Sequence, residues 1–240
     1  MDRKYITSVR LSSPIDECSY LHNLPVVRCL ARMKALVFSN DVTFLVGENG
    51  TGKSTLIEAI AVAYGFNAEG GTRNFNFATN ATHSDLDQHL RLSRSAHPKD
   101  GFFLRAESFY NTASYIDKVG ATHNYGKRSL HEQSHGESFL ALVENRFSGN
   151  GLYLLDEPES ALSPNRLMSL LVLIHALVKK NSQFIIATHS PILMTYPGAT
   201  VYQLSEDGIL SVDYRQTEHY QLTRRFLENP ETMLHHLLDE

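Results

Sequence analysis

Short apolar runs, separated by polar loops and helical stretches, dominate the hydrophobic pattern of this chain. Three mainly apolar runs are short enough for fully buried strands: Val42–Val46, Gly151–Asp156 and Gln183–Thr188. Helical stretches follow the first run at about 53–64 and the second at about 165–180. The order strand, helix, strand from 151 to 188 predicts a right-handed crossover unit and an α/β sheet.

The remaining pattern predicts an antiparallel arm and a second lobe. Apolar runs near the start predict the short strands of the arm, at 5–11, 26–30 and 35–38. Polar clusters loosen the pattern between 68 and 147, where we expect one strand at 101–106 and one helix at 136–147. We expect a single domain over 1–240, with a nucleotide-binding core at 1–67 and 148–240 and a smaller, largely helical lobe at about 68–147.

The C-terminal part of the chain continues the sheet and then becomes helical. Two β-like runs, at 200–204 and 209–214, flank the turn Glu206-Asp207-Gly208. Helical segments are predicted after them at about 222–228 and 230–238, the second beginning at a proline.

A glycine-rich loop joins the first buried strand to the helix that follows it. Its residues are Gly47, Glu48, Asn49, Gly50, Thr51, Gly52, Lys53 and Ser54. Glycines let several backbone N–H groups approach one anion, and a helix start adds unpaired donors and a positive dipole end. We therefore expect a nucleotide-phosphate site in which Lys53 reaches the β- and γ-phosphates and Ser54 is a magnesium ligand. Thr55 is either a ligand of the α-phosphate or an ordinary residue of the first helical turn.

Adjacent carboxylates end the second buried strand, at Asp156 and Glu157. In phosphoryl transfer, positioning and electrostatics do most of the work. Asp156 is suited to orienting magnesium and its waters, and Glu157 to polarising an attacking water. With the phosphate loop, this pair predicts an enzyme that hydrolyses ATP with Mg²⁺ as cofactor.

These motifs make the chain similar to the ABC ATPase family, and more narrowly to stand-alone relatives of the RecF, SMC and Rad50 heads. Gln133-Ser134-His135-Gly136-Glu137 resembles the ABC signature, in which serine and glycine contact the γ-phosphate on the opposite subunit. Ser160-Ala161-Leu162-Ser163 resembles the D-loop, and Thr188-His189-Ser190 the switch motif, whose histidine senses the γ-phosphate. The resemblance implies a P-loop NTPase fold of the ABC type. It adds Ser134, Gly136, Glu137, Ser160 and His189 to the expected site.

Some positions depart from the family pattern. His135 stands where the signature usually has glycine, and Ser163 where the D-loop usually has aspartate. Since a Cβ restricts the backbone, His135 would alter how closely the signature approaches phosphate. Glu107 stands about where the family has its Q-loop glutamine, which implies a third metal ligand; an ordinary solvent-facing glutamate is the alternative, and Gln88 is the competing position.

Composition excludes several other classes. The 240 residues are 42% hydrophobic with a net charge of −4, typical of a globular domain and not of a chain coated in nucleic acid. Basic residues outnumber acidic ones between 88 and 131, where a solvated face is favoured over a nucleic-acid patch. Cys18 and Cys29 are expected to be reduced thiols, and no apolar run approaches the roughly 20 residues of a membrane span. We expect a cytoplasmic protein without direct membrane insertion.

A signature that acts on the opposite subunit implies a head-to-tail homodimer around two ATP molecules. Only about eighty residues separate phosphate loop and signature, with no sustained heptads, so no coiled-coil arm is expected. The leading hypothesis is an ATPase whose dimer opening and closing controls a separate protein partner, in DNA repair or defence; the nucleic-acid link rests on kinship alone. The alternatives are the nucleotide-binding subunit of a membrane transporter and a non-hydrolysing ATP-dependent switch, against which Glu157 and His189 argue.

Overall fold

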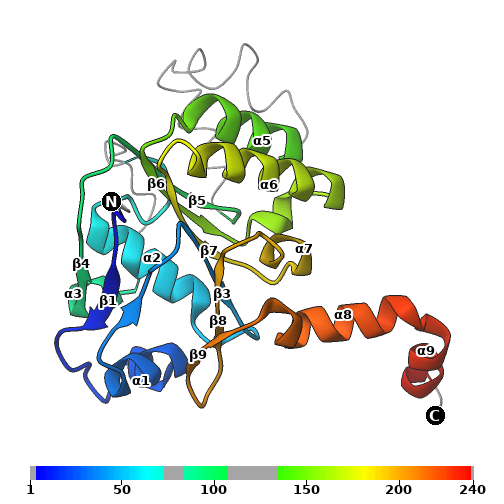
Figure 1. Cartoon of the computed structure of the whole chain (residues 1–240). Coiled ribbons are helices and arrows are strands. Elements are labelled where there is room, and N and C mark those ends of the chain that lie inside the picture. The colour runs from blue at the N-terminus through cyan, green and yellow to red at the C-terminus, as the bar shows by residue number, and fades with distance from the viewer. Residues whose placement is uncertain (1–3, 73–83, 108–134, 239–240) are drawn as a thin grey trace.

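A six-stranded sheet forms the centre of the protein. The computed structural model describes residues 4–72, 84–107 and 135–238 (Figure 1). The strand order is β5-β6-β7-β3-β8-β9, parallel except for β9 at one edge. The strands are β3 (Val42–Val46), β5 (Asp100–Arg105), β6 (Gly151–Asp156), β7 (Gln183–Ala187), β8 (Thr200–Leu204) and β9 (Ile209–Val212). The mixed α/β fold predicted from the sequence is therefore confirmed.

Helices cover both faces of this sheet. On one face lies α2 (Lys53–Tyr64), with the short α3 (Leu86–His89) beside it. On the other face lie α5 (His135–Arg146), α6 (Pro164–Val178) and α7 (Pro191–Met194) (Figure 1). Every residue of β3, β6 and β7 is buried, as a parallel sheet between two helical layers requires.

A second, three-stranded antiparallel sheet packs on the α2 side and matches the expected arm. Its order is β2-β1-β4, formed by β1 (Ser8–Leu11), β2 (Leu36–Val37) and β4 (Leu90–Ser93). The sequence pattern missed β4, because its alternation Leu90-Arg91-Leu92-Ser93 lies within a long polar stretch. It also assigned a strand to residues 26–30, and this prediction was wrong.

Residues 26–30 belong to helix α1 (Pro25–Arg32), which follows a short 3₁₀ helix, η1 (Tyr20–Asn23). Pro25 occupies the first turn, where its fixed φ and missing N–H cost nothing. Val26, Val27, Cys29 and Leu30 are all buried, a spacing that puts one face of a helix against the core. Over only five residues, an apolar run of this kind does not separate helix from strand.

Strand β5 lies in the range 68–147 that was expected to form a separate lobe. It nevertheless pairs along its whole length with β6 of the central sheet, from Asp100 opposite Gly151 to Arg105 opposite Asp156. Among the described residues of that range, the helices are the short α3 and the longer α5. The division of the chain into core and lobe stays a prediction.

The C-terminal segment runs from η5 (Tyr214–Gln216) into α8 (Glu218–Glu228) and α9 (Pro230–Leu238) and projects from the body (Figure 1, orange to red). Neither α8 nor α9 contains a buried residue. In the described parts of the chain, no helix combines the length and apolar character that crossing a bilayer requires.

Candidate functional site

The carboxyl ends of three adjacent strands, β6, β7 and β3, lie at one height in the sheet. Ala187 of β7 is level with Asp156 on one side and with Leu45 on the other. Backbone hydrogen bonds continue past the strands, since Glu157 N–H donates to the Ala187 carbonyl (2.9 Å) and Thr188 N–H to the Leu45 carbonyl (3.1 Å). The loops that follow the three strands therefore meet at one edge, where open parallel sheets bind ligands.

The glycine-rich loop after β3 turns sharply into α2. Gly47, Gly50 and Gly52 have φ of 148°, 84° and 92°, values that side chains with a Cβ rarely adopt. A Cβ on Gly47 would lie 2.3 Å from the Leu204 carbonyl oxygen, and one on Gly52 would lie 2.5 Å from Val26. Glycine is thus favoured by conformation at all three positions, and at Gly47 and Gly52 also by space.

Lys53, the first residue of α2, turns back into the loop. Its ammonium donates to the carbonyls of Gly47 (2.8 Å) and Glu48 (3.0 Å). Burial lowers the pKa of Lys53, although nearby Glu157 and Asp156 raise it. The Thr51 hydroxyl donates to the same Glu48 carbonyl at 2.8 Å, which holds the loop closed on itself. A buried cation therefore lies at the helix start, as an anion site requires.

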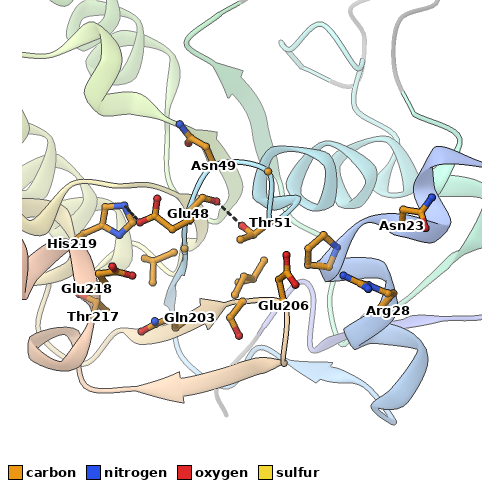
Figure 2. Close-up of a pocket in the computed structure, with 16 residues that line it drawn as sticks. Asn23, Arg28, Glu48, Asn49, Thr51, Gln203, Glu206, Thr217, Glu218 and His219 are labelled. Carbon is orange, nitrogen blue, oxygen red and sulfur yellow. Dashed lines mark hydrogen bonds and ion pairs between the residues drawn. The ribbon is translucent and has the colours of Figure 1, made fainter.

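A cavity of about 480 Å³ opens beside this loop (Figure 2). Its walls come from four separate segments: α1, the glycine-rich loop, the end of β8 and the start of α8. Arg28 and Asn23 lie to one side of the loop in Figure 2, and His219 lies to the other. The volume suits a small ligand the size of a nucleoside.

Asp156 lies at the end of β6, nearly fully buried. Burial raises the pKa of Asp156 to about 7. The Arg105 cation and a hydrogen bond with Ser54 act in the opposite direction and lower it. The Arg105 Nε atom is 3.7 Å from Asp156 Oδ2, whereas Asp156 Oδ1 is buried without a hydrogen-bond partner. An unpartnered carboxylate oxygen beside a serine at a phosphate loop fits Mg²⁺, which takes oxygen ligands at such sites.

Glu157 adopts a left-handed conformation, with φ of 49°. The Ser160 side chain and backbone both donate to its carbonyl, at 2.9 and 3.1 Å, within the 3₁₀ helix η4 (Pro158–Ala161). Non-glycine residues hold such a conformation only where their surroundings enforce it. The turn directs the Glu157 side chain to the switch motif, where its Oε1 lies 3.5 Å from His189 Nε2.

The switch residues after β7 are fixed by a second glutamate. The Glu159 carboxylate accepts a hydrogen bond from the His189 backbone N–H. Burial raises the pKa of Glu159, and this hydrogen bond opposes the rise. Burial, followed by Lys53 and His219, lowers the pKa of His189. The lowered pKa favours the neutral imidazole of His189, which lies next to the Glu157 carboxylate.

Part of the signature lies outside the described residues, including Ser134 and Gln133. Gly136 lies in the first turn of α5, where a Cβ would meet Arg166 at 2.5 Å and the Ala161 carbonyl oxygen at 2.9 Å. Glu137 forms an ion pair with Arg166 at 3.0 Å. Gly136 thus lies against the D-loop and Glu137 pairs with α6, and neither lines the cavity beside the phosphate loop.

The expected site residues thus fall into separate groups. Lys53, Asp156, Glu157 and His189 come together at the sheet edge, with Ser54 hydrogen-bonded to Asp156. Thr55 lies half-buried in the first turn of α2, and Asn49 is exposed on the loop. Glu107 is 82% exposed and pairs with Arg105 at 3.3 Å, so it reaches Asp156 only through that arginine in the described structure.

Three residues of the site were missed by the sequence analysis: Arg105, Glu159 and His219. Arg105 and Glu159 each stand next to a motif, but only the fold brings them to Asp156 and His189. His219 lies thirty residues beyond His189, yet its Nε2 is 2.9 Å from His189 Nδ1. No local spacing signals that contact, because it is made between separate helices and loops.

Two family models match the chain. One, described as an AAA domain, covers residues 27–139, and another, described as an AAA domain, putative AbiEii toxin, Type IV TA system, covers 122–195. Among curated proteins, a ribose import ATP-binding protein, RbsA, of Yersinia pestis is 29% identical over 193 residues. That match covers 71% of this chain and 36% of the relative, so the chain spans about a third of the length of the curated relatives it matches.

Solved structures share the fold at low sequence identity. The CbiO1 protein of Clostridium perfringens, part of the ABC transporter complex CbiONQ, is similar with a TM-score of 0.54 and 16% identity, over 98% of this chain and 99% of that one. A putative metal-chelate type ABC transporter in an inward-facing conformation is similar with a TM-score of 0.50 and 15% identity, over 93% of this chain and 88% of that one. At these identities the likeness concerns the fold.

Proposed function

We propose that this chain, which is similar to ABC-class ATP-binding proteins, hydrolyses ATP with Mg²⁺ and dimerises around the nucleotide to control a separate protein partner. The observation that carries the proposal is the convergence of Lys53, Asp156, Glu157 and His189 from three strand ends held level by Ala187. Such a cluster supplies the positioning and electrostatics on which phosphoryl transfer depends.

Each of these residues has a chemical role in this reaction. The loop N–H groups and Lys53 bind the β- and γ-phosphates, and the base and sugar occupy the neighbouring cavity. Ser54 and Asp156 would hold Mg²⁺, which supplies charge neutralisation on the phosphate oxygens. Glu157 accepts a hydrogen bond from the attacking water and orients it in line with the bond to be broken. His189 donates from Nε2 to the γ-phosphate.

The dimer is proposed because the signature residues that the structure describes do not line the nucleotide cavity. Gly136 lies against the D-loop, Glu137 pairs with Arg166 of α6, and neither lines any part of that cavity. A head-to-tail pair would bring the signature of one subunit, including Ser134, to the γ-phosphate of the other. ATP would then join the two subunits, and hydrolysis would release them.

Phosphate release and solution size test this proposal. We expect the purified chain to release phosphate from Mg-ATP, Lys53→Ala to lose ATP binding, and Glu157→Gln to bind ATP without turnover and elute as a dimer. If the wild-type chain binds ATP but releases no phosphate, the result would contradict hydrolysis and favour the hypothesis of a non-hydrolysing switch. A Glu157→Gln chain that stays monomeric at saturating ATP would contradict the dimer.

A transporter subunit is the second candidate, because the curated relatives are named as import ATP-binding proteins. The partner would then be a permease and not a protein acting on DNA. Affinity purification from the native cell separates the two: co-purification of a membrane permease favours the transporter, and DNA or a nuclease favours repair or defence.

A further inference from the structure

The second residue of α8, His219, reaches the switch histidine from the C-terminal end of the chain. Its Nε2 lies 2.9 Å from His189 Nδ1, and the two rings meet edge to face with centroids 4.8 Å apart. One nitrogen of such a pair must donate a hydrogen and the other accept it. The direction of this hydrogen bond decides which nitrogen of His189 carries its proton.

Two carboxylates select the direction. His189 Nε2 lies 3.5 Å from Glu157 Oε1, and His219 Nε2 lies 3.6 Å from Glu48 Oε1 (Figure 2 shows the second pair). If His189 Nδ1 were the donor, Nε2 of His189 would present its lone pair to the Glu157 carboxylate, which repels it, and His219 Nε2 would lie near Glu48 without a hydrogen. If His219 is the donor, its Nε2–H points to His189 Nδ1, and the hydrogen of His189 is on Nε2, where it faces the Glu157 carboxylate.

We propose that His219 donates from Nε2 to His189 Nδ1 and thereby holds the switch histidine in the tautomer whose Nε2–H faces the reaction centre. His219 is then a positioning residue that acts through His189. The inference rests on the proposed hydrolysis for its consequence, because only the Nε2–H form of neutral His189 donates to a γ-phosphate. Fixing a ring nitrogen through the other nitrogen is a common device at active sites.

The start of α8 is anchored well enough to hold His219 in place. Thr217, 1% exposed, donates from its hydroxyl to the Tyr214 carbonyl at 2.6 Å and lies against Met194 of α7. Asp213 caps the preceding turn by accepting from the Arg215 N–H at 2.8 Å. His219 is itself only 20% exposed. Its ring therefore has a defined position although the rest of α8 is open to solvent.

Two substitutions of different hydrogen-bonding capacity test the proposal. His219→Leu removes the donor, whereas His219→Gln keeps an N–H at about the same reach. We expect the leucine variant to lower kcat at saturating ATP about 10-fold or more; kcat is the quantity compared because His219 also lines the cavity and its loss can change ATP affinity. The glutamine variant should recover most of that loss. His236→Leu in the exposed part of α9 is the matched control and should leave kcat unchanged.

Nitrogen-15 spectra of histidine-labelled protein read the tautomer directly, with His189→Asn used for assignment. We expect a protonated Nε2 on His189 in the wild type and a mixture of tautomers in His219→Leu. In a His189→Ala background, His219→Leu should cause no further loss of kcat, since the two residues act as one unit.

Several results would overturn the proposal. They are a protonated Nδ1 on His189 in the folded wild type, an unchanged kcat in His219→Leu, or a glutamine variant as slow as the leucine one. If the wild type shows the expected tautomer but releases no phosphate, the hydrolytic function fails while the assignment of the hydrogen bond stands.

Discussion

The guanidinium of Arg105 lies between Asp156, 3.7 Å away, and the carboxylate of Glu58, to which it hydrogen-bonds. It is the cation that opposes the effect of burial on Asp156. Arg105, at the end of β5, therefore lowers the pKa of Asp156, the expected metal ligand, although β5 itself carries none of the motifs.

Replacing Arg105 by glutamine should raise the Mg²⁺ concentration needed for half-maximal ATP turnover about 10-fold at pH 7. Without the cation, the pKa of Asp156 rises further above about 7, and less of it is ionised to bind metal. Titration of Mg²⁺ at pH 7 and pH 9 measures the effect, which should shrink at pH 9. Arg105→Lys keeps the charge and is the control; a defect equal at both pH values would indicate structural damage instead.

Asp156→Asn should stabilise the protein free of ligands while abolishing its stabilisation by Mg-ATP. The pKa of Asp156 is raised from 3.8 to about 7 on folding, so between these values the native state holds a proton that the unfolded state releases. Stability therefore falls as pH rises through this window in the wild type. Urea unfolding at pH 8 should give the variant about 1 kcal/mol or more of extra stability. A less stable variant at pH 8 would contradict the raised pKa.

Gly47→Ala and Gly50→Ala separate steric from conformational requirements in the phosphate loop. Both positions have positive φ, but only at Gly47 does an added Cβ meet backbone, the Leu204 carbonyl. Gly50→Ala should cost about 1 kcal/mol of stability from strain alone. Gly47→Ala should cost about 2 kcal/mol more and lower ATP affinity by at least about 10-fold. If thermal unfolding and ATP titration show the same loss of stability and of ATP affinity for both variants, the close contact between Gly47 and β8 would be contradicted.

Asp100→Asn should lower stability at neutral pH by about 1–3 kcal/mol. Burial opposes ionisation of Asp100, but hydrogen bonds from the Ser148 N–H and the Tyr153 hydroxyl, with Arg146, outweigh it and lower the pKa below 3.8. The contribution is complete above pH 3.8 and is lost as pH falls through the folded-state pKa. The difference in unfolding free energy between wild type and variant should therefore narrow below about pH 4. Asp207→Asn, at an exposed turn, is the control. If the difference in unfolding free energy between wild type and Asp100→Asn stays constant down to pH 3, the lowered pKa of Asp100 would be refuted.

The sequence predicted the central part of the fold well because its signals are local. Strands 42–46 and 151–156 and helix 53–64 have the predicted bounds, since apolar runs there end at glycines or carboxylates. Helix 164–178 was displaced by a residue or two, as is usual at helix ends. The narrower kinship to RecF, SMC and Rad50 heads stays a prediction.

What the sequence could not supply were contacts between segments far apart in the chain. Helix α1 meets the phosphate loop at Val26, whose N–H donates to the Thr51 carbonyl and whose side chain lies beside Gly52, and a five-residue window of sequence does not contain this contact. Arg105 and His219 were missed for the same reason, since each acts through a residue more than twenty-five positions away. The roles assigned to Ser134, Glu107 and Thr55 rest on the family pattern alone.

Ala187 sets the register of both strands beside it at the edge that carries the candidate site. A slip of β7 by one residue would shift its end by about 3.3 Å and turn its buried side chains to the opposite face. Since that strand pairs with both β6 and β3, neither neighbouring loop could move alone without breaking the same ladder. The distances between Lys53, Glu157 and His189 therefore depend on one shared strand register. We expect the candidate site to be lost in a single step, together with the folded core of the sheet.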